Sequence, residues 1–205
     1  RRSETVTHYY RGVNTSHAST PLGALIRASS AADIPAITAT YRTAVLKGTG
    51  TFEITPPDEA EMGRRREDVL SKGLPWLVAE RNGQVLGYAY ANTFRPRPAY
   101  RYFLEDSIYL SPEAQGMGLG RLLLAELIAR CTTWGARQMV AVIGDSANAA
   151  SIGVHRSCGF EHTGVLKSSG WKFDRWLDVV LMQRTLGAGA LQAPGSTEAS
   201  AGTAR

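Results

Sequence analysis

The fold of this chain is decided by one glycine-rich stretch, Gln115-Gly116-Met117-Gly118-Leu119-Gly120-Arg121. The stretch lies between a predicted strand over residues 103–110 and a predicted amphipathic helix over residues 119–134. Successive glycines let backbone N–H groups approach a ligand closely, and the first turn of a helix adds unpaired N–H groups and a positive dipole end. The stretch therefore predicts a phosphate-binding cradle at a helix N-terminus.

The spacing of the glycines excludes two common nucleotide-binding loops. The dinucleotide pattern G-x-G-x-x-G fails because Gly120 is followed by Arg121 and Leu122, and the stretch lies in the middle of the chain rather than after a first strand. A Walker A loop is excluded because no Gly-Lys-Ser/Thr follows. For the loop taken alone, a tight turn without a ligand remains the alternative.

Helical and strand patterns alternate on both sides of this stretch. We expect helices over 30–46, 58–72, 119–134 and 147–157, and strands near 24–27, 76–80, 85–90, 103–110, 139–143, 160–168 and 176–184. Asn82-Gly83 between two β-prone runs predicts a hairpin, because a type I′ turn needs positive φ at both central residues. The resulting order, β-α-α-β-β-β-α-β-α-β-β, predicts an α/β domain with a mixed sheet.

Length and composition limit the class of protein. The chain has 205 residues, of which 43% are hydrophobic and 20% charged, as in one globular domain with a full core. Residues 1–22 are polar and aperiodic, and residues 187–205 are rich in Gly, Ala, Ser, Pro and Thr. We therefore expect an N-terminal tail, a domain over 23–186 and a disordered C-terminal tail. The absence of a long apolar run or an apolar signal region favours a cytoplasmic protein without a membrane partner.

Charge and cysteine content exclude further classes. The net charge is +5, but the densest basic run, 64–66, is followed at once by Glu67 and Asp68. That pattern predicts a solvated helix face rather than a nucleic-acid surface, and a modest positive surplus suits a small anionic ligand. Two cysteines make no disulfide framework, and no His/Asp/Glu cluster has ligand spacing, so we expect no metal.

Two motifs in sequence order carry a family resemblance. The pattern Gln115-x-x-Gly118-x-Gly120 is similar to the Q/R-x-x-G-x-G/A acyl-CoA signature of the GNAT N-acetyltransferase superfamily, and residues 148–160 resemble its next motif. The resemblance covers about 24–186 and is closest to the phosphinothricin and methionine sulfoximine N-acetyltransferase group. It implies a GNAT-type α/β fold: a mixed, mostly antiparallel sheet, splayed at the catalytic strand, with helices on both faces. It also implies acetyl-CoA as co-substrate and a homodimer.

The same resemblance implies how acetyl-CoA would bind. Its pyrophosphate would rest on the amides of residues 117–121, its pantetheine arm would lie like an extra strand beside residues 108–111, and α-helical residues after 147 would hold that arm. The implied cofactor-binding residues are Leu110, Ser111, Gln115, Gly116, Met117, Gly118, Leu119, Gly120, Arg121, Asn148 and Ser151.

Acetyl transfer to an amine needs a base, because an amino-acid ammonium is mostly protonated at pH 7. Glu105 is the candidate, since it lies on the strand face opposite Leu104 and aligns with the catalytic glutamate of the group; a salt-bridged strand residue is the alternative. Asp106 points to the other face and is less suited. A backbone N–H near Leu110 would stabilise the oxyanion. His155 stands where many GNAT enzymes have a tyrosine, and is either the general acid for the CoA thiolate or a structural histidine.

The substrate pocket is predicted less sharply. In the loop that leads into the catalytic strand, the resemblance points to Arg97, which offers bidentate recognition of an anionic group, and to Tyr100. Phe52 matches a position that packs on the substrate, and Lys172 is a further candidate, with Glu105 also in contact. The alternatives are solvated loop arginines and a core phenylalanine.

These observations favour an N-acetyltransferase that moves the acetyl group of acetyl-CoA to a small amino-acid-like amine of the phosphinothricin or methionine sulfoximine type. The first alternative keeps the cofactor and changes the acceptor to a protein N-terminus, a polyamine or an aminoglycoside. A second alternative is a non-catalytic acyl-CoA-binding module on the same fold. The basic residues of the predicted substrate loop favour an anionic small-molecule acceptor.

Overall fold

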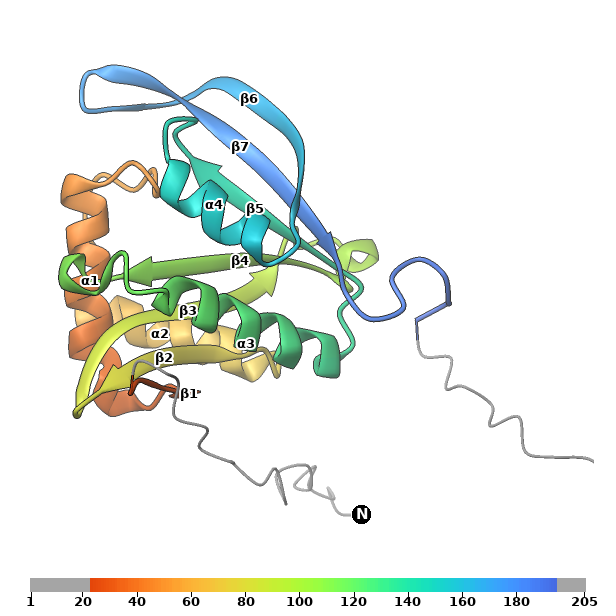
Figure 1. The fold of residues 1–205 in the computed structure, drawn as a ribbon, viewed down its shortest axis with the longest axis horizontal. Coiled ribbons are helices and arrows are strands. Elements are labelled where there is room, and N and C mark those ends of the chain that lie inside the picture. The colour runs from red at the N-terminus through yellow and green to blue at the C-terminus, as the bar shows by residue number, and fades with distance from the viewer. Residues whose placement is uncertain (1–22, 195–205) are drawn as a thin grey trace, which may run out of the picture.

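The computed structural model describes residues 23–194; the predicted tail 1–22 and residues 195–205 lie outside the described residues. Within that range seven strands form one sheet in the order β1-β2-β3-β4-β5-β7-β6 (Figure 1). The strands are β1 (Leu25–Ala28), β2 (Trp76–Arg81), β3 (Gln84–Thr93), β4 (Phe103–Leu110), β5 (Gln138–Gly144), β6 (Glu161–Lys172) and β7 (Arg175–Thr185). The α-helices are α1 (Ile34–Lys47), α2 (Glu59–Ser71), α3 (Leu119–Trp134) and α4 (Ala149–Ser157). The predicted order of elements is confirmed.

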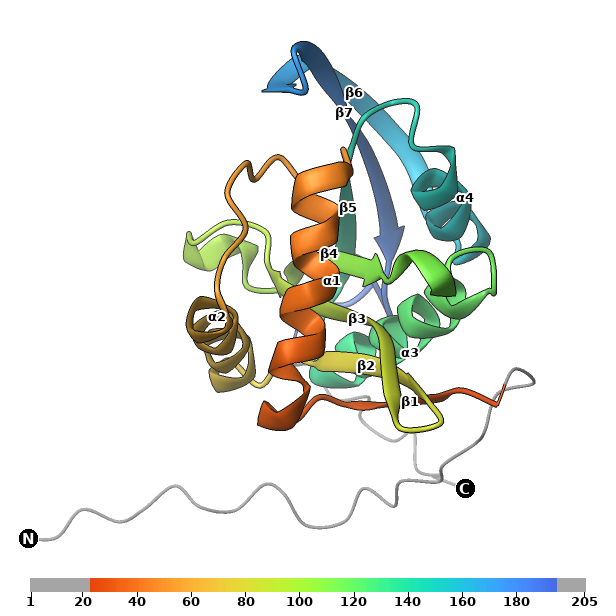
Figure 2. The same cartoon turned by 90° about the vertical axis from the view of Figure 1, so that its left-hand side faces the viewer.

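The sheet is mostly antiparallel, with β4 and β5 as its parallel pair. Helices α1 and α2 cover one face of the sheet, and α3 and α4 cover the other (Figure 2). The apolar stripe predicted for α3 is buried against the sheet, with Leu123, Leu124 and Leu127 fully inaccessible. The mixed sheet with helices on both faces, as predicted, is therefore confirmed.

Local sequence signals explain where elements begin and turn. Asn82 and Gly83 both have positive φ, 51° and 78°, as the type I′ hairpin between β2 and β3 requires. The side chain of Asp58 accepts a hydrogen bond from Glu61 N at 2.8 Å and so caps the N-terminus of α2. The predicted start at Ser30 opens as a 3-10 turn, and α1 itself begins at Ile34.

The C-terminal part departs from the sequence-based boundaries. Strand β6 runs to Lys172 and meets β7 through a tight turn in which Phe173 and Asp174 have φ values of 53° and 54°. A turn without glycine gave no sequence signal, so β6 was predicted to end at residue 168. Residues 187–194, placed by the sequence in the disordered tail, form successive turns that include a bond from Gly189 N to Leu186 O.

The feature that creates a site is a gap in the middle of the sheet. Strands β4 and β5 pair only over Phe103–Asp106 and Gln138–Ala141, and then diverge (Figure 1). On its other side β4 stays paired with β3, and Ser111 N donates to Leu86 O there. Since backbone groups alternate in direction along a strand, the N–H and C=O groups of Ile108 and Leu110 face the gap.

Candidate active site

A cavity of about 860 Å³ lies in the gap between β4 and β5. Its walls are the end of α1 and the loop after it, β4 from Glu105 onward, the glycine-rich loop, the end of β5 and α4 up to His155. The volume lies in the range of small-molecule and cofactor sites, about 300–1,000 Å³. The predicted site residues that line it are Phe52, Glu105, Leu110, Gln115, Gly116, Gly118, Gly120, Arg121, Asn148, Ser151 and His155.

The glycine-rich loop leaves the N-terminus of α3 open to an anion. Gly118 takes the N-cap position in the left-handed region, with φ of 76°, and provides no side-chain cap. The amides of the first helical turn, residues 119–121, therefore have no intrahelical acceptor. A Cβ on Gly120 would stand 3.6 Å from Leu110 and 3.5 Å from Val154, so the loop packs closely between β4 and α4. This arrangement fits the diphosphate of a nucleotide cofactor.

Three of the predicted cofactor residues do not line the cavity. Ser111 is buried and its N–H is bonded to Leu86 O, so its backbone serves the sheet. The side chain of Leu119 is buried in a small apolar cluster with Leu86, and Met117 packs against that cluster. Met117 and Leu119 could therefore bind a ligand only through their backbone amides, in the glycine-rich loop and in the first turn of α3.

Glu105 lies half-buried on the wall of the cavity, and strand alternation puts it on the same sheet face as Tyr109. On the same face, the ring of Tyr109 packs edge-on against Tyr41 of α1, with ring centroids 4.9 Å apart. Burial raises the pKa of the Glu105 carboxyl, the charge of Asp106 raises it further, and the charge of Arg95 opposes the rise. A carboxylate with a raised pKa is closer to the operating pH of a general base.

His155 lies on the opposite sheet face, where its imidazole bonds to Asp106. Nε2 is 2.9 Å from Oδ2 of Asp106, and Nδ1 is 2.8 Å from the carbonyl oxygen of Ser151. Because a carbonyl only accepts, Nδ1 carries a proton. Burial lowers the pKa of His155, but the hydrogen bond and charge of Asp106 outweigh burial and raise it overall. With both ring nitrogens bonded inside the protein, the geometry favours the structural alternative over the general acid.

Asn148 caps the helix that carries His155. Its side-chain oxygen accepts a hydrogen bond from Ser151 N at 3.2 Å, so this oxygen orients α4 beside the cavity. The hydroxyl of Ser151 lies 3.4 Å from Nδ1 of His155. The two residues predicted to hold a cofactor therefore line the cavity and also build its wall.

The predicted substrate residues of the loop before β4 lie outside the cavity lining. Arg97 is exposed at the start of a 3-10 turn, Pro98–Tyr100, and Tyr100 packs edge-on against Phe94 at 5.8 Å. Arg95, which the sequence analysis did not single out, is the arginine whose charge acts on Glu105. Its guanidinium stands over the ring of Phe94, 4.8 Å from the centroid.

Phe52 lines the cavity, whereas Lys172 does not. The ammonium of Lys172 is buried and donates to the carbonyl oxygens of Gly48 and Thr51, at 2.9 and 2.8 Å. Lys172 was predicted to contact the substrate. In the structure its ammonium instead bonds to the backbone of the loop that carries Phe52.

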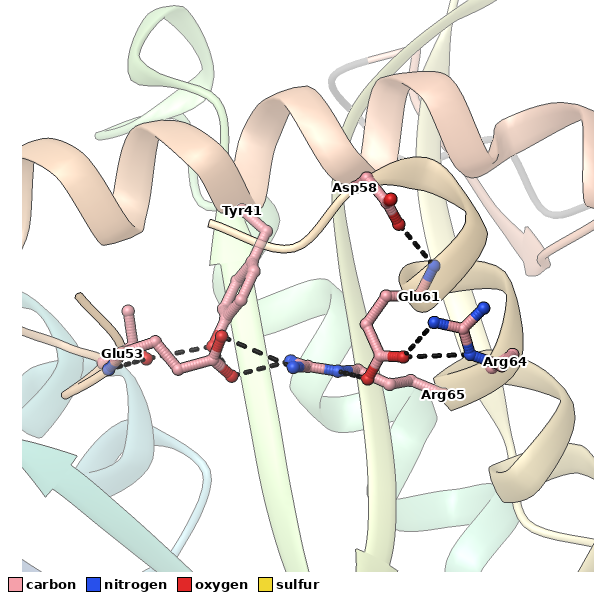
Figure 3. Close-up of polar contacts among 7 residues, drawn as sticks. Tyr41, Glu53, Asp58, Glu61, Arg64 and Arg65 are labelled. Carbon is pink, nitrogen blue, oxygen red and sulfur yellow. Dashed lines mark hydrogen bonds and ion pairs between the residues drawn. The ribbon is translucent and has the colours of Figure 1, made fainter. Parts of the chain in front are cut away.

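A polar network holds the other side of this loop, and the sequence analysis did not find it. The hydroxyl of Tyr41 lies 3.0 Å from Thr51 Oγ1 and donates to Glu53 at 3.0 Å, and Arg65 of α2 donates to Glu53 at 2.6 Å (Figure 3). Burial raises the pKa of Tyr41 to about 12, so its hydroxyl stays protonated. The bonded residues lie ten or more positions apart in the sequence. Their polar side chains were therefore the one sequence signal for these contacts.

The described part of the chain has neither a cluster of metal ligands nor a membrane-spanning helix. In residues 23–194, no three His, Cys, Asp or Glu side chains gather as a metal site requires. No helix in that part of the chain is long and apolar enough to cross a membrane.

Known proteins resemble this chain in sequence and in structure. Residues 41–160 match the acetyltransferase (GNAT) family. A phosphinothricin N-acetyltransferase of Alcaligenes faecalis is 57% identical over 162 residues, which cover 79% of this chain and 82% of the relative. An L-methionine sulfoximine/L-methionine sulfone acetyltransferase of Pseudomonas aeruginosa is 42% identical, over 80% of this chain and 96% of the relative.

A solved structure agrees with the sequence relatives. The GNAT superfamily phosphinothricin acetyltransferase of Sinorhizobium meliloti, crystallised with AcCoA, superposes with a TM-score of 0.81 at 51% identity, covering 86% of this chain and 94% of that one. Sequence, fold and the open helix N-terminus at the sheet gap agree, and the chain is therefore an N-acetyltransferase of the GNAT family.

Proposed function

We propose that this enzyme moves the acetyl group of acetyl-CoA to the amine of a small amino-acid-like substrate, of the phosphinothricin or methionine sulfoximine type. The relatives with those activities in their names support the substrate class. The observation that carries the proposal is the half-buried carboxylate of Glu105, which lines the same cavity as the uncapped N-terminus of α3. A base and an anion cradle in one cavity are what acetyl transfer from a CoA thioester to an amine requires.

Acetyl-CoA would supply the activated thioester. The backbone amides of residues 116–121 and the side chain of Arg121 would hold its diphosphate, and Gln115 borders the same loop. The backbone groups of Ile108 and Leu110 would pair with the pantetheine amides, because they face the sheet gap. Asn148 and Ser151 would border the pantetheine arm from α4.

Glu105 would act as the general base. The raised pKa of its carboxyl brings it nearer to that of the substrate ammonium, so it can take a proton, directly or through a water molecule. The neutral amine would then attack the thioester carbonyl directly, so no enzyme nucleophile is needed. As the C–N bond forms, the C–S bond would break, and CoA would leave as a thiolate that takes up a proton from solvent or from the acetylated nitrogen. The N–H of Leu110 faces the gap and would stabilise the negative charge that develops on the carbonyl oxygen.

Charge in the loop before β4 would select the substrate. Arg97 and Tyr100 lie in this loop, outside the cavity lining, and the charge of Arg95 acts on Glu105. A carboxylate or phosphinate on the substrate would find these guanidinium groups as bidentate partners. Phe52 would pack on the apolar part of the substrate.

Thiol release from acetyl-CoA tests the proposal. A panel of phosphinothricin, methionine sulfoximine, methionine sulfone, spermidine and an aminoglycoside is run with the wild type, with Glu105→Gln, and with Glu161→Gln as an exposed control. We expect turnover with the amino-acid analogues, a loss of about 10²–10⁴-fold in Glu105→Gln, and wild-type activity in the control. Turnover with spermidine or the aminoglycoside alone would overturn the substrate class. Tight binding of acetyl-CoA without turnover on any amine would favour a non-catalytic module.

We further propose that the enzyme is a homodimer. Four large apolar side chains around the β6–β7 hairpin, Leu166, Trp171, Phe173 and Trp176, are about half exposed, and the two tryptophan rings pair across the strands at 5.3 Å. Monomeric proteins rarely expose large apolar patches, so a second copy would cover this one. Sedimentation should give a dimer that Trp171→Ser weakens; a wild-type monomer at micromolar concentration would contradict the proposal.

We also propose a cytoplasmic location. Both cysteines, Cys131 and Cys158, are free and buried, as is usual where thiols stay reduced. Fractionation of cells that express the native chain should recover the activity in the cytosol, and recovery in a secreted or membrane fraction would refute it.

A further inference from the structure

We propose that Lys172 is a positioning residue, which sets the shape of the amine pocket by holding the loop 48–52 against the ends of β5 and β6. The inference rests on the proposed function for its kinetic readout, and on the structure alone for the position of the loop.

The Lys172 ammonium is fully engaged by groups of the protein itself. Its side chain comes from the end of β6, is 5% exposed, and reaches the carbonyl oxygens of Gly48 and Thr51, more than 120 residues away in sequence. The ammonium also stands 5.1 Å from the ring centroid of Phe173. An ammonium has three donors. Two carbonyls and one ring therefore occupy the directions that a substrate anion would need.

Burying the charge of the Lys172 ammonium costs free energy. No described carboxylate forms an ion pair with Lys172 within 4 Å, and burial lowers its pKa, an effect that the more distant charge of Glu53 opposes in part. A buried cation held by two backbone carbonyls and one aromatic ring, with no carboxylate within ion-pair distance among the described residues, is an unfavourable element of a core. An apolar residue would fill the space at lower cost, so the bonds to the loop are what the lysine contributes.

The loop 48–52 lies on a part of the sheet formed by two glycines. Gly144, the last residue of β5, and Gly170 of β6 both lack a side chain where the loop docks. A Cβ on Gly144 would overlap the carbonyl oxygen of Thr49, and a Cβ on Gly170 would overlap the ring of Phe52. The Phe52 ring thus lies directly on the backbone of the sheet, and a small displacement of the loop would move it.

The loop is held from both sides, with Phe52 between the anchors. Lys172 bonds its backbone on the side of β6, and the Tyr41–Glu53–Arg65 network bonds residues 51 and 53 on the side of α1 and α2 (Figure 3). Phe52 and Glu105 line one cavity. The position of the loop therefore helps to set the shape of the cavity in which a substrate side chain would lie.

The matched variants are Lys172→Met, which keeps length and removes the donors, and Lys167→Met, an exposed lysine on the same strand, paired with Asp178. Lys172→Arg retains a donor. Gly170→Ala displaces Phe52 while leaving the ammonium in place, so it keeps the test valid if Lys172→Met does not fold.

Two measurements are made on the full chain. Steady-state kinetics compare methionine sulfone with the analogue shortened by one methylene, at saturating acetyl-CoA. In Lys172→Met and Gly170→Ala we expect KM for methionine sulfone to rise at least tenfold, the preference between the two amines to change, and KM for acetyl-CoA to stay within twofold. Lys172→Arg should recover part of the effect, and Lys167→Met should match the wild type. Hydrogen exchange of amides 48–53 should accelerate in Lys172→Met and stay unchanged in Lys167→Met.

Three outcomes would overturn the inference. Unchanged exchange of amides 48–53 in Lys172→Met shows that the ammonium does not hold the loop. A rise in KM for the amines without faster exchange makes Lys172 a direct substrate ligand. Equal rises in KM for both substrates with a lower melting temperature indicate a general loss of structure. If the wild type acetylates none of the amines, the proposed function fails, while hydrogen exchange still decides the role of Lys172.

Discussion

The bond between His155 and Asp106 offers a quantitative test of what holds the two sides of the sheet gap together. Asp106 is the last residue of β4 that pairs with β5, and its side chain is almost fully buried. Its Oδ1 has no hydrogen-bond partner, so Nε2 of His155 is the partner that the carboxylate depends on. Replacing His155 with Leu would leave a buried carboxylate unpaired.

The expected magnitude follows from this geometry. Removing one partner of a buried ion pair costs about 3–5 kcal/mol, because the other charge stays buried and uncompensated. Replacing both partners with apolar residues of similar volume is often close to neutral. We therefore expect His155→Leu to lower the free energy of unfolding by about 3–5 kcal/mol, and the double variant with Asp106→Leu to recover most of that loss.

The pH dependence gives a second signature. The folded-state pKa of His155 is raised above its unfolded value, about 6.5, since the bond and charge of Asp106 outweigh burial. Its protonation thus contributes stability that is fully present below pH 6.5 and is lost as pH rises through the folded pKa. The difference in the free energy of unfolding between wild type and His155→Leu should be largest at or below pH 6.5 and should narrow as pH rises through the folded-state pKa of His155.

Urea unfolding, followed by circular dichroism at pH 6.5, 8 and 9, measures all three proteins. Three results would refute the reasoning. They are a free energy of unfolding for His155→Leu within 1 kcal/mol of the wild type, a double variant no more stable than His155→Leu, and a stability difference between wild type and His155→Leu that widens as pH rises. Any of these would mean that the pair does not carry its charges in the folded enzyme, and would reopen the role of His155 as a proton donor.

Three further predictions concern pKa values. Because the charge of Asp106 helps to raise the pKa of Glu105, Asp106→Asn should move the acidic limb of kcat/KM to lower pH; an unmoved limb would contradict the coupling. The bonds from Arg27 lower the pKa of Asp33 to about 2, so Asp33→Asn should lower the free energy of unfolding by roughly 2 kcal/mol at pH 7. The difference from the wild type should disappear as pH falls from 4 to 2, and a pH-independent difference in urea unfolding would contradict the prediction. Burial raises the pKa of Cys131 to about 12, so the native enzyme should resist alkylation at this thiol at pH 8, as mass spectrometry would show, with rapid labelling indicating an open core.

Much of the fold could be predicted because its signals are local. Asn82-Gly83 determines its own hairpin, Asp58 caps its own helix, and Gly118 allows a helix to start with uncapped amides. The period-2 pattern also placed Glu105 and Asp106 on opposite faces, and the structure shows them there, with Asp106 bonded to His155 of α4.

What could not be predicted depends on contacts between distant residues. No sequence signal joins Asp106 to His155, or Lys172 to the loop after α1, because each pair meets only when the sheet assembles. The position of β7 between β5 and β6 has the same origin. Arg97 was preferred over Arg95 by family resemblance, and the direction of each side chain depends on a loop conformation that residue types do not specify.

The short pairing between β4 and β5 also has a consequence for how the molecule unfolds. It divides the sheet into two blocks, one of β1, β2, β3 and β4 and one of β5, β7 and β6, which share backbone hydrogen bonds over only four residues of each adjoining strand. Cooperativity between the blocks must then come from side chains and from whatever occupies the gap. A ligand lying along the free edge of β4 would contact both blocks at once. The enzyme should therefore unfold most cooperatively when its cofactor is bound. Thermal denaturation would then report cofactor occupancy as a change in the width of the transition as well as in its midpoint.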